Sequence, residues 1–195
     1  MALAGFGACA GSPTAPAHLP SLVDLDGRPV DPQALAREAG TAAVFLFTRA
    51  DCPISNRYAP EVRRLAELFG AQGVRVALVY PNPDATAEDI REHLERYGYT
   101  SAGESQGESL LALRDPDQAF ALATGAEITP EAVVLDGEGR LVYRGRIDDR
   151  WVAFGQLRAE PTRRDLEEVL TALAARETFE LRTTQAVGCL IEDLS

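Results

Sequence analysis

The order of hydrophobic and polar positions along the chain predicts alternating strands and amphipathic helices. Continuous apolar runs at residues 41–48 and 74–80 are typical of strands covered on both faces of a sheet. Between them an apolar stripe at helical spacing predicts a helix over residues 53–69, and a capping pattern predicts a further helix over residues 86–97. Strand, helix and strand in this order are typical of a parallel βαβ unit.

Shorter patterns predict the rest of the chain. Residues 100–109 are small and polar, which indicates a loop. The remaining elements are a hairpin over residues 21–30, a short helix over 115–123, a strand over 131–136 with its hairpin partner over 141–147, and an amphipathic helix over 162–175. A βαβ unit followed by a hairpin and a helix predicts an α/β domain with a mixed central sheet flanked by helices.

Length and charge bound the class of protein. The chain has 195 residues, 46% of them apolar, which suits one domain with a buried core and an extra segment. Its 19 basic and 30 acidic residues give a net charge of −11 without a basic cluster, so nucleic acid is not an expected partner. No apolar stretch approaches the roughly 18 residues of a membrane span. We therefore expect a folded domain over residues 21–195 that ends in a tail over 178–195.

Residues 1–20 are expected to lie outside that domain. They lack Lys, Arg and acidic side chains, and small residues precede Cys9. This pattern resembles the end of a bacterial lipoprotein signal, whose cysteine is lipidated after cleavage. The alternative is a flexible leader with an incidental cysteine. The first interpretation predicts a lipid anchor at Cys9 and a periplasmic or membrane-anchored protein, whereas the second also allows a cytoplasmic one.

The three cysteines are too few for a disulfide scaffold and do not form a zinc pattern. Cys52 lies between the first central strand and the helix that follows. The N–H groups at a helix N-terminus stabilise a thiolate there, which lowers the pKa and increases nucleophilicity. The charge of Asp51 works against the thiolate, whereas Arg49 or Arg57 could favour it.

Four segments carry a resemblance to a known family: residues 51–60 (DCPISNRYAP), 129–132 (TPEA), 143–150 (YRGRIDDR) and 187–189 (VGC). With the element order, they make the chain resemble the thioredoxin-like fold over residues 20–195. More narrowly, it is similar to the redoxin or peroxiredoxin-like branch (the AhpC/TSA superfamily), in a bacterial subgroup with a Cys-Pro-Ile-Ser motif. The resemblance implies a mixed sheet flanked by helices, with an N-terminal hairpin and a C-terminal tail extension.

The resemblance also implies roles for the residues around Pro130. Pro130 would be the cis proline that faces the active-site cysteine, and Thr129 would present backbone groups to a bound substrate chain. The motif departs from thioredoxins, because Ser55 stands where the local resolving thiol would be. It also departs from peroxiredoxins, because they carry the peroxide-attacking cysteine at the Ser55 position and a Thr at the Cys52 position.

A lone thiolate can attack a disulfide, but release of the mixed disulfide needs a second thiol. Cys189 is the candidate, because about ten residues after the last helix, at about 3.3 Å each, can reach back to Cys52. Gly188 would allow the tight turn that aims the sulfur. The alternative is that Cys189 is a small buried hydrophobic residue.

Our first functional hypothesis is a monomeric, redox-active thiol–disulfide oxidoreductase. Cys52 would be the attacking thiolate, Ser55 and Arg57 would tune it, Pro130 would frame the substrate, and Cys189 would resolve the mixed disulfide. The expected partners are protein thiols or disulfides, or a thioredoxin-type reductant, and no organic cofactor is implied.

Three alternatives stay open. The thiols of Cys52 and Cys189 with the imidazole of His93 could imitate the copper site of Sco-type carriers, since thiolates suit Cu(I). His93, however, is in a predicted surface helix, where a solvated side chain is the competing interpretation. The domain could also be a redox-silent binding module, or an atypical thiol peroxidase that uses Cys52.

Overall fold

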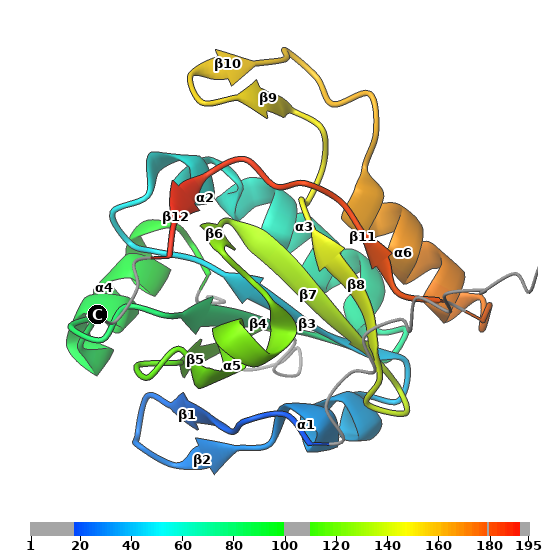
Figure 1. The fold of residues 1–195 in the computed structure, drawn as a ribbon, viewed down its shortest axis with the longest axis horizontal. Helices are drawn as coiled ribbons and strands as arrows, with labels where there is room; N and C mark the ends of the chain where they lie inside the picture. Colours follow the sequence, from blue (N-terminus) through cyan, green and yellow to red (C-terminus); the bar gives the residue numbers. More distant parts are fainter. Residues whose placement is uncertain (1–17, 100–109, 179, 192–195) are drawn as a thin grey trace, which may run out of the picture.

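The two continuous apolar runs form the centre of the β-sheet (Figure 1). Strands β3 (Ala42–Phe47) and β4 (Val74–Tyr80) pair in parallel, with Ala42 opposite Val74, and every residue of β3 is buried. The computed structural model describes residues 18–99, 110–178 and 180–191. Cys9 and the loop predicted at 100–109 lie outside the described residues.

Eight strands in the described part of the chain form one mixed sheet. In order across the sheet they are β11 (Arg182–Thr183), β8 (Leu141–Gly145), β7 (Glu131–Asp136), β3, β4, β5 (Leu110–Arg114), β1 (Leu22–Asp24) and β2 (Pro29–Val30). β7 is antiparallel to β3 and β8, whereas β5 is parallel to β4. The predicted α/β class with a mixed central sheet is therefore confirmed. The hairpin predicted over residues 21–30 and the pairing predicted between residues 131–136 and 141–147 are also present.

Helices cover both faces of this sheet (Figure 1). They are α1 (Pro32–Ala39), α2 (Pro53–Arg57), α3 (Ala59–Gly70), α4 (Ala87–Arg96), α5 (Ala119–Thr124) and α6 (Asp165–Ala174). Alternate residues of β3 enter different cores, since side chains alternate across a strand. Val44 packs with α3, α4 and α6, and Phe45 packs with α1 and α5.

The helix predicted over residues 53–69 is in fact two helices, α2 and α3. The break lies at Tyr58, whose backbone N–H bonds to Ser55 O. Pro60, in the first turn of α3, has no N–H to donate to the carbonyl four residues earlier. The interruption leaves α2 as a short helix that carries Cys52 at its start.

Other elements also differ from the sequence-based expectation. The pattern did not predict α1, β5 or the hairpin formed by β9 (Trp151–Ala153) and β10 (Gln156–Leu157). α5 begins at Ala119 rather than at residue 115, because the Asp115 carboxylate accepts hydrogen bonds from the N–H groups of Phe120 and Ala121 and so caps the helix from a preceding turn.

The predicted boundary of the leader at residue 20 is too late. Leu19 is 2% exposed and belongs to the core that contains Phe45, and its N–H bonds to the Gln33 side chain at 3.2 Å. Within the described ranges, no helix has the length and apolar character needed to cross a membrane.

A buried carboxylate fastens the tail to the domain. Asp165, at the start of α6, is fully buried and accepts from Arg146 Nε at 2.7 Å and from Arg182 Nη2 at 3.0 Å. Arg182 lies in β11, which pairs in parallel with β8 and is the first tail segment on the sheet. Arg146, directly after β8, therefore takes part in the attachment of the tail.

We expect Asp165→Asn to lower the free energy of unfolding by about 2 kcal/mol, since it removes the negative charge that Arg146 and Arg182 share while both arginines still reach some solvent. Chemical denaturation measures this change. The matched control is Glu92→Gln, which breaks an exposed ion pair with Arg96 and should cost less than about 0.5 kcal/mol. Equal effects of the two substitutions would contradict the prediction.

Candidate active site

Cys52 is the N-cap residue of α2, directly after the turn that follows β3. Its φ of −84° and ψ of 110° are extended, and Pro53 occupies the first turn of the helix. The carbonyl of Cys52 accepts the first helical hydrogen bond from Asn56 N at 3.0 Å. The Cys52 side chain is only 1% exposed, so the sulfur lies at a helix N-terminus and under cover.

The surroundings of Cys52 favour its thiolate. Burial by itself raises the pKa of Cys52, but hydrogen bonds from Cys189, from the Ser55 hydroxyl and from the N–H groups of Ser55 and Ile54 outweigh it, so the pKa is lowered. Among the described residues, the buried Ser55 hydroxyl has no other hydrogen-bond partner, which leaves its proton free to turn toward the sulfur.

Cys189 lies against Cys52 although 137 positions separate them in the chain. Their Sγ atoms are 2.7 Å apart and both thiols are free. Burial, followed by the hydrogen bond to Cys52, raises the pKa of Cys189 to about 11. The two sulfurs therefore differ in character: Cys52 favours the thiolate, and Cys189 stays a thiol that donates its hydrogen to Cys52.

A short strand pairing brings Cys189 to this position. β12 (Cys189–Leu190) is antiparallel to β6 (Ile128–Thr129), with Cys189 opposite Thr129. The strand passes so close that a Cβ atom on Gly188 would lie 2.1 Å from Thr129 O. Only glycine fits there, because a side chain would collide with backbone rather than with a movable group.

The peptide bond between Thr129 and Pro130 is cis, as the resemblance implied. It follows β6 and precedes β7, so it lies at the end of a central strand of the sheet. In its thiol form Cys52 donates to Thr129 O at 3.3 Å, and the Thr129 hydroxyl donates to Cys189 O at 3.4 Å. One residue thus contacts both cysteines.

A comparison with protein families covers the part of the site around Cys52 and Pro130, and it ends before Cys189. The sequence model of the Redoxin family matches residues 10–159, which include β3, Cys52 and the cis proline. The chain belongs to the Redoxin family. A comparison with curated proteins finds no significant match.

Solved structures share the fold of this redoxin over nearly the whole chain. A hypothetical protein from Sinorhizobium meliloti is 26% identical with a TM-score of 0.68, and covers 88% of each chain. An uncharacterised conserved protein from Geobacillus kaustophilus is 24% identical with a TM-score of 0.71, and covers 93% of this chain and 92% of its own. A secreted disulfide oxidoreductase of Mycobacterium tuberculosis is 18% identical with a TM-score of 0.51, and covers 80% and 94%.

Of the two arginines expected to favour the Cys52 thiolate, Arg49 lies beside the cysteines and Arg57 points away from them. Arg49 pairs with Asp51 through two hydrogen bonds of 3.1 and 3.0 Å, which offsets the carboxylate beside the cysteines. Arg57 is exposed at the end of α2 and, within the described part of the chain, makes no hydrogen bond with either cysteine. It lines a separate pocket. Ser55 is thus placed to tune Cys52, and Arg57 is not.

His93 is buried, and the expectation of a solvated histidine was wrong. Its side chain is 3% exposed, with Nδ1 2.8 Å from the Tyr80 hydroxyl and Nε2 2.8 Å from Asn56 Oδ1. Asn56 Nδ2 in turn donates to Ala50 O at 2.8 Å. The amide oxygen of Asn56 can only accept, so His93 Nε2 donates to it and His93 Nδ1 accepts from the Tyr80 hydroxyl. Asn56 in turn holds the turn before Cys52.

This network was missed at the sequence level, although a signal for it existed. Ile90, His93 and Leu94 recur at the three- and four-residue spacing of one helical face, so His93 shares the apolar face of α4. Both ring nitrogens are occupied by hydrogen bonds. Among the residues that the structure describes, no group of three or more His, Cys, Asp or Glu side chains could hold a metal ion.

The buried histidine predicts a pH effect on stability. Burial, and then the charge of Arg96, lower the pKa of His93 below its ordinary 6.5. As pH falls through about 6.5, the unfolded chain binds a proton that the folded protein takes up less readily, so stability decreases by at most about 1.4 kcal/mol per pH unit. Denaturation at several pH values should show a shallower decrease for His93→Gln below pH 6.5. Parallel curves would contradict the assignment.

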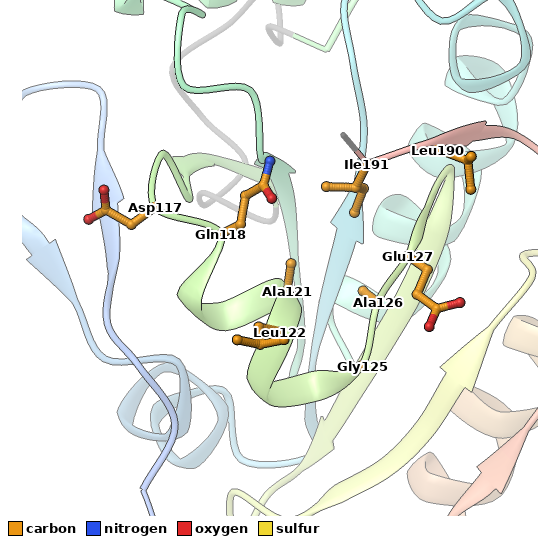
Figure 2. Close-up of a pocket in the computed structure, with 9 residues that line it drawn as sticks. All are labelled: Asp117, Gln118, Ala121, Leu122, Gly125, Ala126, Glu127, Leu190 and Ile191. Atoms are coloured by element: carbon orange, nitrogen blue, oxygen red, sulfur yellow. The ribbon is translucent and has the colours of Figure 1, made fainter. Parts of the chain in front are cut away.

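The end of the tail also borders an open pocket of about 510 Å³. Figure 2 shows it between α5, which carries Ala121 and Leu122, and the tail, which carries Leu190 and Ile191. Ile191 N bonds to Glu127 O at 2.9 Å, whereas the side chain of Leu190 is 70% exposed. The tail therefore forms one wall of a partly apolar surface beside the cysteine pair.

Proposed function

We propose that this redoxin is a thiol–disulfide oxidoreductase that acts as a monomer, with Cys52 as the attacking thiolate and Cys189 as the resolving thiol. The proposal rests on one observation: a cysteine with a lowered pKa at a helix N-terminus lies 2.7 Å from a second free thiol. Fold similarity to a disulfide oxidoreductase of Mycobacterium tuberculosis supports it.

The two steps balance as follows. The Cys52 thiolate attacks one sulfur of a substrate disulfide, which forms a mixed disulfide and releases the first substrate thiolate. Cys189 then attacks Cys52 Sγ, and its proton passes to the second substrate sulfur as that leaves. The substrate disulfide gains two electrons and the cysteine pair becomes a Cys52–Cys189 disulfide. A thioredoxin-type dithiol returns the pair to its reduced form by the same chemistry.

Substrate access requires a movement of the tail. Cys52 is almost fully covered, and β12 occupies the edge of β6 beside it. The backbone of Thr129 that would pair with a substrate chain is therefore already paired with Cys189. β12 is only two residues long, so its separation from β6 breaks few hydrogen bonds.

Peptide mapping by mass spectrometry tests the pairing. The full chain is equilibrated in an oxidising glutathione buffer, alkylated and digested without reduction. We expect a peptide with a Cys52–Cys189 disulfide, which disappears on treatment with dithiothreitol. The finding of both cysteines as alkylated thiols under oxidising conditions would reject the proposal.

The same two thiols make Cu(I) binding the second candidate, because paired thiolates suit this ion. The ligands of the ion would be the sulfurs of Cys52 and Cys189, without His93, whose ring nitrogens have other partners. Titration of the reduced protein with Cu(I) separates the two candidates: tight one-to-one binding that Cys189→Ala removes, together with failure to reduce insulin, favours a carrier. Sulfenic acid at Cys52 after brief peroxide exposure favours a peroxidase instead.

A further inference from the structure

A second pocket, of about 230 Å³, lies at the far end of α2 from Cys52. Its lining residues are Arg57, Tyr58, Arg150, Trp151 and Leu157. The last two belong to the β9–β10 hairpin, which stands off the sheet (Figure 1). The pocket shares no residue with the cysteine pair.

Two nitrogen donors of this pocket are buried without an acceptor. Arg150 Nε and Trp151 Nε1 are both inaccessible to solvent, and neither has a hydrogen-bond partner in the described part of the protein. Buried N–H groups are nearly always paired, since loss of water is costly when no acceptor replaces it. Both groups belong to side chains that line the pocket, so a rotation of these side chains would present two unused donors to an acceptor bound there.

The charges around the pocket define the acceptor. Arg57 makes no ion pair with a described residue, and Arg150 has one weak pair, Nη2 to Glu160 Oε2 at 3.4 Å, with Glu160 80% exposed. The neighbouring Asp148 is already an acceptor for the Tyr58 hydroxyl at 2.6 Å and for Arg150 N at 2.9 Å. Cationic donors thus remain unused in a protein whose net charge is −11.

We propose that this pocket binds a carboxylate. Its two planar oxygens suit a guanidinium fork and can also accept from the indole N–H. Leu157 offers an apolar wall to the carbon chain behind the carboxylate. The source is either a small free acid or an acidic side chain of a partner protein. For the second source, Arg57 is five residues from Cys52, or about 7.5 Å along a helix.

Trp151 makes the test direct, because it is the only tryptophan of the chain. The full-length protein is titrated with propionate at constant ionic strength, and tryptophan emission is recorded. We expect a saturable change that propionamide does not produce. Arg57→Gln should weaken the binding by at least tenfold, whereas Arg37→Gln, on the exposed end of α1, should leave it unchanged.

Further arms separate the sources and the outcomes. A blocked Gly-Glu-Gly peptide that binds more tightly than propionate identifies a protein side chain, and the reverse order identifies a free acid. Equal responses to propionate and propionamide, equal affinity for inorganic phosphate, or an unaffected Arg57→Gln variant would overturn the proposal. Cys52→Ser should retain binding, so this inference stands or fails separately from thiol exchange.

Discussion

Replacement of Cys189 by serine should lower turnover in an insulin reduction assay by about 100-fold or more, without loss of the first attack by Cys52. The proposed resolving step should be fast because the two sulfurs lie 2.7 Å apart, a proximity that an external thiol does not match. Serine keeps a hydroxyl donor near the Cys52 thiolate but cannot form a disulfide. The variant should therefore accumulate as a mixed disulfide on Cys52, which intact-protein mass spectrometry detects.

Two controls make this result specific. Cys52→Ser should give neither turnover nor a trapped adduct, because it lacks the attacking sulfur. Cys9→Ser should behave as the unmodified chain if the third cysteine takes no part. Full turnover of the Cys189→Ser variant would assign resolution to an external thiol and would leave Cys189 without a catalytic role.

A single methyl group added at Gly188 should move Cys189 away from Cys52 and so disturb the pair almost as much as the loss of the Cys189 sulfur. The added Cβ of Gly188→Ala would lie 2.1 Å from Thr129 O and 2.7 Å from Thr129 C, and these backbone atoms cannot turn aside as a side chain would. The tail must then leave β6, so Cys189 no longer faces Cys52. In a fixed glutathione buffer we expect the fraction of Cys52–Cys189 disulfide relative to free thiols to fall by at least about tenfold.

The same substitution should change the chemistry of Cys52. Without the hydrogen bond from Cys189, the pKa of Cys52 should rise toward that of an ordinary cysteine, so its alkylation should need a higher pH. Leu190→Ala is the matched control, because this neighbouring side chain is 70% exposed and its loss creates no clash. A Gly188→Ala variant that still forms the disulfide as readily as Leu190→Ala would contradict the geometry described for β12.

The position of Cys52 was predictable because it depends on local signals. Residues 41–48 are an unbroken apolar run, Pro53 suits a first helical turn, and the cysteine lies between them. The cis bond at Pro130 was expected on a different ground, because the resemblance to redoxins implied it. The partnership with Cys189 was less certain, since reach alone allowed it without requiring it. The structure brings the two sulfurs together through the pairing of β12 with β6, in which Gly188 passes close to Thr129.

The surroundings of the site were harder to predict, because their contacts join distant segments. The roles of His93 and Arg57 illustrate this difference. His93 is buried by its helical face, but the partners that orient it, Tyr80 and Asn56, come from a strand and another helix. Arg57 follows the cysteine motif closely, yet the helix directs it to a pocket completed by the β9–β10 hairpin.

By itself, the sequence determined the α/β class, the central strands and the placement of Cys52 at the start of a helix. These features follow from hydrophobic periodicity, prolines and caps, which act within one or two turns of chain. Only the tertiary structure decided which groups meet: Cys189 with Cys52, His93 with Asn56, and Arg57 with Trp151 at one pocket. Such contacts depend on how the sheet, helices and tail pack together, and a local sequence pattern does not specify which distant residues come into contact.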